Sequence, residues 1–306
     1  MLTFIIRRFF TMIPILIGVT LITFSIMHLS EGDPARIMLG LMASEEAIAH
    51  IRQVHGLDLP LHIQYFRWLG RIITGDFGRS IQSRRPVIEM IRDRLPATLE
   101  LTITAMVLAL LVGITAGIIS AVRQYSWLDY SSMTFALFGV SMPPFWLGLM
   151  MMLIFGVRLG WLPISGRGDL NQLIMPAIVL STAQMAIIAR LVRSSMLEVI
   201  RQDYILTARS KGLAERIVIY KHALKNAMIP VVTMVALQLP FLFGGAVITE
   251  TIFSWPGMGR MLVGSLFERD FPVIQGTVLI IAIIVMFANL LADIVYAIVD
   301  PRIRFD

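Results

Sequence analysis

Residues 190–225 read RLVRSSMLEVIRQDYILTARSKGLAERIVIYKHALK, and this polar stretch lies between two long apolar segments. It contains eight basic and three acidic residues, with apolar positions at helical spacing and a glycine at Gly212. No apolar run inside it is long enough to cross a bilayer. The pattern predicts a short amphipathic helix–turn–helix that is displayed outside the membrane between two spans.

The composition of the whole chain indicates a polytopic membrane protein. Hydrophobic residues make up 57% of the 306 residues and charged residues only 15%, whereas soluble domains carry about 25% charged residues. The chain has no cysteine, which excludes disulfides and thiolate metal sites. Basic residues that flank membrane spans explain the net charge of +6 more simply than nucleic-acid binding does.

Six apolar segments are long enough to span a bilayer of about 30 Å. The first is too long for a cleavable signal peptide and lacks a small-residue cleavage site, so we expect it to stay as an anchor. The fourth is the weakest, because it contains Pro176 and Gln184, and we expect it to be buried inside a helix bundle. The predicted spans are 9–29, 99–122, 133–157, 173–193, 227–249 and 273–299.

The distribution of lysine and arginine predicts the orientation. With the amino terminus inside, the inner segments hold thirteen basic residues and the short outer loops hold four. The long 30–98 segment carries further arginines, but segments of this length cross the membrane largely regardless of charge. We therefore expect both termini in the cytoplasm and the 30–98 segment outside.

The 30–98 segment is the only sizeable predicted region outside the membrane. Residues 45–54 and 63–73 have amphipathic helical spacing. Asp33-Pro34 and the stretch 75–78, Gly-Asp-Phe-Gly, are typical of turns. Six apolar residues should form a small core or lie on the outer membrane surface: Leu61, Ile63, Tyr65, Phe66, Trp68 and Leu69.

The sequence contains none of the usual motifs of an energy source or an enzyme. None of the three lysines lies in a phosphate-binding loop, and no two of the five histidines have metal-ligand spacing on a helix. The spans hold few acidic residues. Asp293 lies inside the last span, and we expect it to face the bundle and hydrogen-bond a neighbouring helix. We therefore predict no catalytic residues and no metal site.

Small residues and prolines predict how the spans pack and bend. Gly113 and Gly117 form a G-x-x-x-G pair, which permits close helix approach in the second span. The dipeptide Pro143-Pro144 should break or kink the third span. Pro230 and Pro240 should kink the fifth span, so that a bent helix could line a cavity and rock.

The 190–225 stretch resembles a loop of known transporters. Its core, DYILTARSKGL at 203–213 followed by KHALKNAMIP at 221–230, is similar to the cytoplasmic EAA-type loop of bacterial ABC importer permeases. Ala208, Gly212 and Leu224 match recurring positions of that loop. Leu206 and Lys225 depart from its general pattern in the way that is typical of the peptide/nickel permeases.

The resemblance extends over nearly the whole chain. It is to the first permease subunit of dipeptide, oligopeptide, glutathione and nickel importers. The fragments that carry it follow one order along the chain: IIRRFFTMIPILIGVTLITF, GDPAR, GLDLPLHIQYFRWL, GDFGRSI, RRPV, PATLEL, GVSMPPFWLG, GWLP, ITETIFSWPGMGR, RDFPVIQG and DPRIR.

The resemblance implies an all-α protein with six transmembrane helices, the type I ABC importer permease fold and an extracytoplasmic segment between helices 1 and 2. The implied parts are 1–29 for the amino-terminal end and first helix, 30–98 for the outer segment, and 99–299 for the permease core. The core includes the cytoplasmic coupling loop 194–226, and residues 300–306 form a cytoplasmic carboxyl terminus. The implied location is the bacterial cytoplasmic (inner) membrane.

The resemblance also implies partners. They are a second, homologous permease, two ATPase subunits that bind ATP and magnesium, and a solute-binding protein outside the membrane; this chain itself needs no cofactor and binds no nucleic acid. The residues expected to couple this chain to the ATPase are Tyr204, Ala208, Arg209, Lys211, Gly212, Leu213, Arg216 and Leu224. The small side chain of Ala208 would let the helix seat deeply in a groove of the ATPase subunit. Candidates for the translocation path or its gate are Glu250, Trp255 and Asp293.

Other functions stay open at this point. Dipeptides or oligopeptides are the favoured solutes, and nickel, a nickel chelate or glutathione are the alternatives. A membrane sensor or scaffold would use the 30–98 segment as a receptor, but it would need a larger cytoplasmic domain. A channel would need repeated polar rings along its pore.

Overall fold

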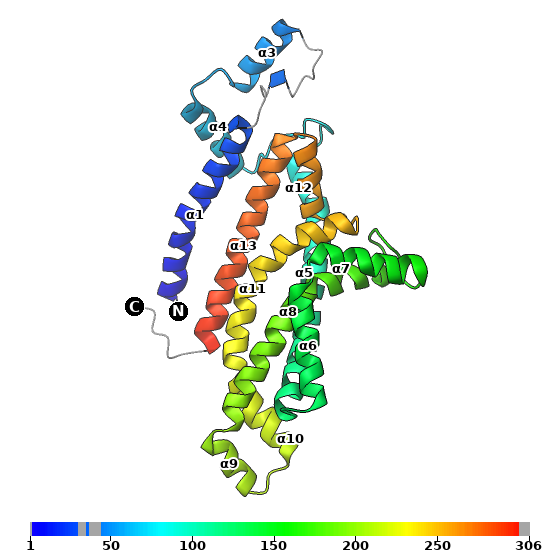
Figure 1. Ribbon diagram of the computed structural model, residues 1–306. Helices are drawn as coiled ribbons and strands as arrows, with labels where there is room; N and C mark the ends of the chain where they lie inside the picture. The colour runs from blue at the N-terminus through cyan, green and yellow to red at the C-terminus, as the bar shows by residue number, and fades with distance from the viewer. Residues whose placement is uncertain (1, 30–34, 37–43, 300–306) are drawn as a thin grey trace.

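The computed structural model describes residues 2–29, 35–36 and 44–299, and these form an elongated helical molecule (Figure 1). No strand occurs in this part of the chain, which has only an isolated bridge between Arg79 and Pro86. The long helices are α1 (Leu2–Leu29), α5 (Val87–Val122), α8 (Leu170–Ile200), α11 (Leu224–Ile252) and α13 (Phe271–Val299). The shorter ones are α3 (Glu45–His55), α4 (Leu61–Ile73), α6 (Trp127–Ser141), α7 (Pro144–Met151), α9 (Asp203–Ser210), α10 (Glu215–Ile217) and α12 (Met258–Phe267).

Five of the described helices are long and apolar enough to cross a membrane, and a bent pair makes a sixth span possible. That pair is α6 with 144–158, which bends by 106° where 133–157 was predicted as one span. Pro143 and Met142 adopt extended ψ angles, and Pro144 starts α7 at its first turn. A proline forces the residue before it out of the helical region, so the predicted break occurs here as a sharp turn.

The α5–α8 pair forms the centre of the bundle. An added Cβ at Gly117 would lie 2.6 Å from Val192 Cβ, and one at Gly113 would lie 2.9 Å from Ile188 Cγ2. The predicted G-x-x-x-G approach is therefore confirmed, and its partner is α8. The predicted burial of the fourth span is also confirmed, because α8 is the most buried of the five long spans, with 61% of its apolar window inside.

The helices extend beyond several predicted boundaries. The α5 helix begins at Val87, well before the predicted span start at 99, and α8 continues to Ile200. Pro230 and Pro240 lie inside α11, which stays a continuous helix, although its carboxyl-terminal part leans away from its first part in Figure 1. The prolines therefore bend α11 without breaking it. Two π-helical segments, η1 (Met152–Arg158) and η2 (Val218–Ala223), follow α7 and α10.

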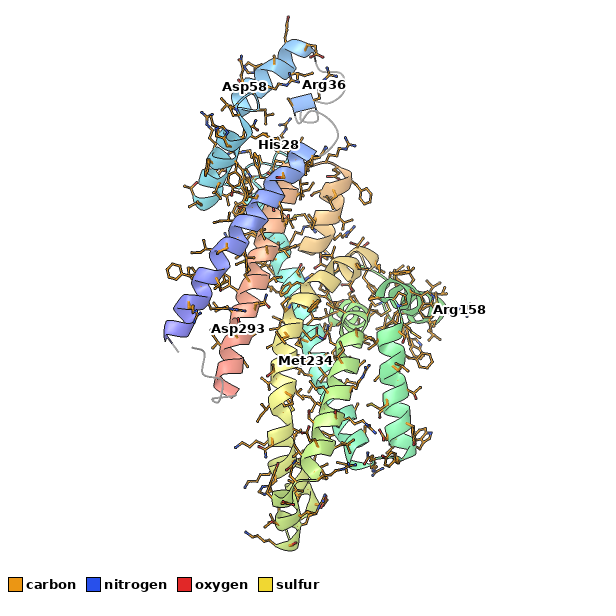
Figure 2. All side chains as sticks on the ribbon, turned by 60° about the vertical axis from the view of Figure 1, so that its left-hand side comes forward. His28, Arg36, Asp58, Arg158, Met234 and Asp293 are labelled. Atoms are coloured by element: carbon orange, nitrogen blue, oxygen red, sulfur yellow. The ribbon has the colours of Figure 1, made fainter. Side chains whose placement is uncertain are left out.

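The outer segment forms the two predicted amphipathic helices. Tyr65 and Trp68 of α4 pack against Phe24 near the end of α1, and Tyr65 Oη lies 2.9 Å from Thr20 Oγ1. Figure 2 shows His28 at the same end of α1, where its Nε2 lies 3.1 Å from Gln64 Oε1. Leu61 and Phe66 are exposed, so only part of the predicted apolar set is core.

The turns of this segment agree with the sequence where the structure describes them. Gly75 and Gly78 both have positive φ angles, which glycine adopts without strain. The predicted Asp33-Pro34 turn lies outside the described residues. The α9–α10 region lies at one end of the molecule and α3 and α4 at the other (Figure 1), so the two predicted extramembrane regions are at opposite ends.

Candidate functional site

The predicted helix–turn–helix exists as α9, α10 and η2, with Gly212 at the turn. Gly212 has φ +74°, its N–H donates to Arg209 O at 2.9 Å, and Leu213 N–H donates to Ala208 O at 3.4 Å. This pair of hydrogen bonds around a left-handed residue is a Schellman motif, which ends a helix and reverses the chain. Glycine is therefore needed here for its backbone conformation.

Two side-chain contacts fix this turn, which we call the elbow (residues 203–223). Arg209 donates to both carboxylate oxygens of Glu215, at 2.6 and 3.2 Å, and so ties α9 to α10. Asn226 Nδ2 donates to Tyr204 Oη at 2.7 Å and ties α9 to α11. One contact therefore lies within the elbow, and the other fastens it to the start of α11.

The burial pattern separates the predicted coupling residues into two groups. Tyr204, Lys211, Gly212, Leu213 and Arg216 are exposed on the elbow surface, and Arg209 is partly exposed. Ala208 is only 7% exposed.

Ala208, expected to seat in a groove of the ATPase subunit, faces the interior of its own chain in this structure. Ala208 belongs to the apolar cluster that joins the elbow to α5, α8 and α11, and Leu224 packs partly buried against the same cluster. The small side chain lets α9 lie close to its own bundle.

A buried ion pair lies in the same part of the bundle as the elbow. Arg193 of α8 donates through Nε and Nη2 to the two carboxylate oxygens of Asp129 in α6, at 2.7 and 2.8 Å. Ser120 Oγ and Tyr125 N–H also donate to this carboxylate, which is 2% exposed. The pair joins α5, α6 and α8. In the sequence Arg193 is one of several basic residues beside a span, and no local pattern marks Asp129 as its partner.

Glu250 and Trp255, predicted for the path or gate, lie in the packed interior. The Glu250 carboxylate accepts from Thr98 Oγ1 at 2.6 Å and from Arg260 N–H at 3.0 Å, and Trp255 Nε1 donates to Ala97 O at 2.8 Å. These contacts anchor the turn between α11 and α12 to α5. A Cβ on Gly257 would lie 2.1 Å from Glu250 Oε1, so the turn packs closely over the carboxylate.

Asp293, the third path candidate, meets α1. Its Oδ2 lies 2.5 Å from Arg8 Nε, in the geometry of an ion pair without hydrogen-bond alignment. Figure 2 shows Asp293 on the side of α13 that faces α1. Asp293 does face a neighbouring helix as expected, but the contact is an ion pair and not the expected hydrogen bond. Asp293 lies apart from Glu250 and Trp255, so the three path candidates do not form one site.

Comparison with known proteins now decides the family. Residues 113–305 match the family described as "Binding-protein-dependent transport system inner membrane component", and residues 1–102 match the amino-terminal family of such membrane components. The chain belongs to this family. It is therefore a membrane permease subunit of an ABC transport system, as the loop and the ordered fragments predicted, and the sensor, scaffold and channel alternatives are set aside.

Relatives are similar over their full length. The chain is 47% identical to a dipeptide transport system permease protein, DppB, of Alkalihalophilus pseudofirmus, and 46% identical to a glutathione transport system permease protein, GsiC, of Salmonella paratyphi A. It is 44% identical to an oligopeptide transport system permease protein, AppB, of Bacillus subtilis. Each alignment covers 100% of both chains.

Solved structures agree on the fold. A chain of the inward-facing MetNI methionine ABC transporter matches with a TM-score of 0.59 at 18% identity, covering 70% of this chain and 97% of that one. The type I ABC importer fold predicted from the sequence is therefore confirmed.

Proposed function

We propose that this chain is one of two permease subunits of an ATP-driven importer of dipeptides or oligopeptides. The full-length similarity to dipeptide and oligopeptide permeases supports this solute class. Glutathione is the second candidate, because a glutathione permease matches almost equally well and glutathione is itself a short peptide-like molecule. We further propose that a binding protein delivers the solute and that the path runs between this chain and a homologous permease.

The elbow is the proposed contact with the ATPase subunit. Its exposed apolar side chains include Tyr204 and Leu213, and the turn also exposes Lys211 and Arg216. Exposed apolar groups beside basic ones suit a protein partner with an apolar groove and an acidic rim. The Arg209–Glu215 ion pair ties α9 to α10, so that the elbow would move as one body. Motion of the ATPase would then reach α8 and α11 through their buried contacts with the elbow.

The proposed orientation places the elbow and both termini in the cytoplasm, with α3 and α4 outside. The bias of basic residues supports it, and so does the separation of the elbow from α3 and α4 in Figure 1. ATP and magnesium would be bound by the ATPase partners, and this chain would contribute no catalytic group. The candidates for a gate stay Glu250, Trp255 and Asp293. Such a gate would act by moving the turn between α11 and α12, or by changing the contact between α1 and α13.

Crosslinking in the assembled transporter tests the docking proposal. The chain has no cysteine, so single cysteines report without background. We expect cysteines at Lys211 and Leu213 to crosslink to the ATPase subunit. A cysteine at Ala208 is the matched control on the same elbow, because that side chain faces the chain's own core, and one at exposed Ser83 is the control from the other end. Crosslinks from Ser83, or none from Lys211 and Leu213, would refute the docking.

A further inference from the structure

A cavity of about 730 Å³ lies between the outer segment and the ends of α1 and α13. Its apolar wall includes Phe24, Trp68 and Phe271, and its rim includes arginines at 67, 71, 79 and 84. Phe24 lies near the end of α1 and Phe271 starts α13. With the spans placed across a bilayer as their length and hydropathy require, the cavity would lie at the level where hydrocarbon gives way to lipid headgroups.

The rim of this cavity carries unneutralised positive charge. Within the described residues, no carboxylate lies within ion-pair distance of Arg67, Arg71, Arg79 or Arg84. Arg79 makes one long hydrogen bond, at 3.4 Å, to Arg84 O. Asp76, the one acidic residue on the lining, already accepts from Gly78 N–H at 2.9 Å. Four guanidinium groups around one acid leave a site of net charge about +3 for an anion.

The helix that carries two of these arginines has the character of an interfacial helix. One face of α4 packs through Tyr65 and Trp68 on α1, while Phe66 and Ile73 are exposed. Exposed large apolar residues beside arginines are typical of a helix lying in the headgroup region. Tryptophan and tyrosine are also enriched at this depth.

The exposed face of α1 continues from the cavity along the membrane span. Ile17 and Leu21 are both more than 40% exposed, and they lie one turn apart on the same side of α1 as the cavity-lining Phe24. An apolar chain could therefore lie along α1 below the cavity while an anionic group reaches the arginines. We propose that the cavity holds the phosphate headgroup of an anionic phospholipid, whose acyl chains follow the outer ends of α1 and α13 and which fastens the outer segment to the membrane core.

Lipid retention by the assembled transporter tests this proposal. The variant is Arg71→Gln, Arg79→Gln and Arg84→Gln together, and the control is Arg92→Gln, Arg94→Gln and Arg158→Gln, which removes the same charge from exposed arginines outside the cavity. Native mass spectrometry would count bound phosphatidylglycerol and phosphatidylcholine. We expect the wild type and the control to retain phosphatidylglycerol preferentially, and the cavity variant to bind it at least about tenfold more weakly.

Other occupants give different results. Equal retention by the cavity and control variants would overturn the proposal. So would displacement of the lipid by millimolar inorganic phosphate, which would indicate a site for free anions. Unchanged lipid retention with weaker docking of the binding protein would assign the arginines to an acidic protein surface, and would equally overturn it.

A second measurement keeps the arginines intact and so does not depend on the folding of the variant. Exposed Ser83, replaced by a single cysteine, can carry a fluorophore beside the rim. Phosphatidylglycerol with a quencher on its headgroup should quench this fluorophore more strongly than quencher-labelled phosphatidylcholine at the same mole fraction. Equal quenching by the two lipids would contradict a selective site.

Discussion

The ion pair of Arg209 within the elbow gives this side chain a different role from the one expected. The loop resemblance assigned Arg209 to the ATPase surface, but its guanidinium binds both carboxylate oxygens of Glu215. Both side chains are more than a third exposed, at 36% and 54%, so the pair contributes at most about 1 kcal/mol to folding. Its proposed role is to fix the angle between α9 and α10.

A double-mutant cycle distinguishes this role from direct contact. We expect Arg209→Gln and Glu215→Gln each to lower peptide uptake per ATP hydrolysed by several-fold, and the double variant to lower it no further than either single change, because all three remove the same ion pair. The free energy of unfolding should change by no more than about 1 kcal/mol in each. Uptake and ATP hydrolysis are measured together in proteoliposomes.

Direct contact between Arg209 and the ATPase predicts a different result for this cycle. If Arg209 binds the ATPase directly, Glu215→Gln leaves coupling intact while Arg209→Gln abolishes it. Lys211→Gln serves as the charge-matched control, since Lys211 is exposed on the same turn. Under the docking proposal it should weaken binding of the ATPase without changing the shape of the elbow.

Sequence reasoning predicted the residues whose role depends on their neighbours along the chain. Gly212 followed from the break in a helical pattern, and its positive φ angle confirms the turn. The inward direction of Ala208 and the burial of Glu250 depend on helices distant in the sequence. Asp129 and Arg193 are 64 residues apart, so only the folded bundle shows that they pair.

At the element scale, the α5–α8 contact depends on two glycines. A Cβ at Gly117 would meet Val192 Cβ at 2.6 Å and the carbonyl oxygen of Ala189 at 2.7 Å, and a backbone oxygen has little room to move. We expect Gly117→Ala to lower the free energy of unfolding by about 1–3 kcal/mol, because the helices must separate. Thermal unfolding of the purified chain in detergent measures the change.

Gly244→Ala is the matched control for this substitution. Gly244 also lies inside a long helix, α11, but a Cβ there meets no atom within 4 Å. Alanine should therefore raise stability by about 0.5–1 kcal/mol, through reduced backbone freedom of the unfolded chain. Equal effects of the two substitutions on the free energy of unfolding would show that the close approach of α5 and α8 does not contribute to stability.

The prolines show how much of the helix geometry can be predicted from the sequence. Pro143-Pro144 ends one helix and starts the next with a turn of 106°, as a break at two successive prolines predicts. Pro230 and Pro240 leave α11 continuous. Whether a proline breaks a helix or only bends it depends on whether neighbouring helices hold its two halves in line. Those contacts between distant segments cannot be predicted from the sequence alone.

The placement of five of the six predicted spans followed from hydropathy because the bilayer fixes the required length, whereas the predicted 133–157 span is a pair of helices bent by 106°. The helix ends did not follow from hydropathy, since α5 continues outside the predicted span as part of the outer segment. The elbow and the outer segment lie at opposite ends (Figure 1). This arrangement is what a subunit needs if it receives solute at one face and mechanical force at the other.

Uptake by the reconstituted transporter shows whether an ATPase partner drives this chain. The chain is placed in liposomes alone, or with the second permease, both ATPase subunits and the binding protein, and accumulation of a labelled dipeptide is followed with and without ATP. We predict uphill accumulation only in the complete set with ATP, and none with the chain alone. Uphill accumulation of the peptide by the chain alone would contradict the claim that an ATPase partner drives it through the elbow.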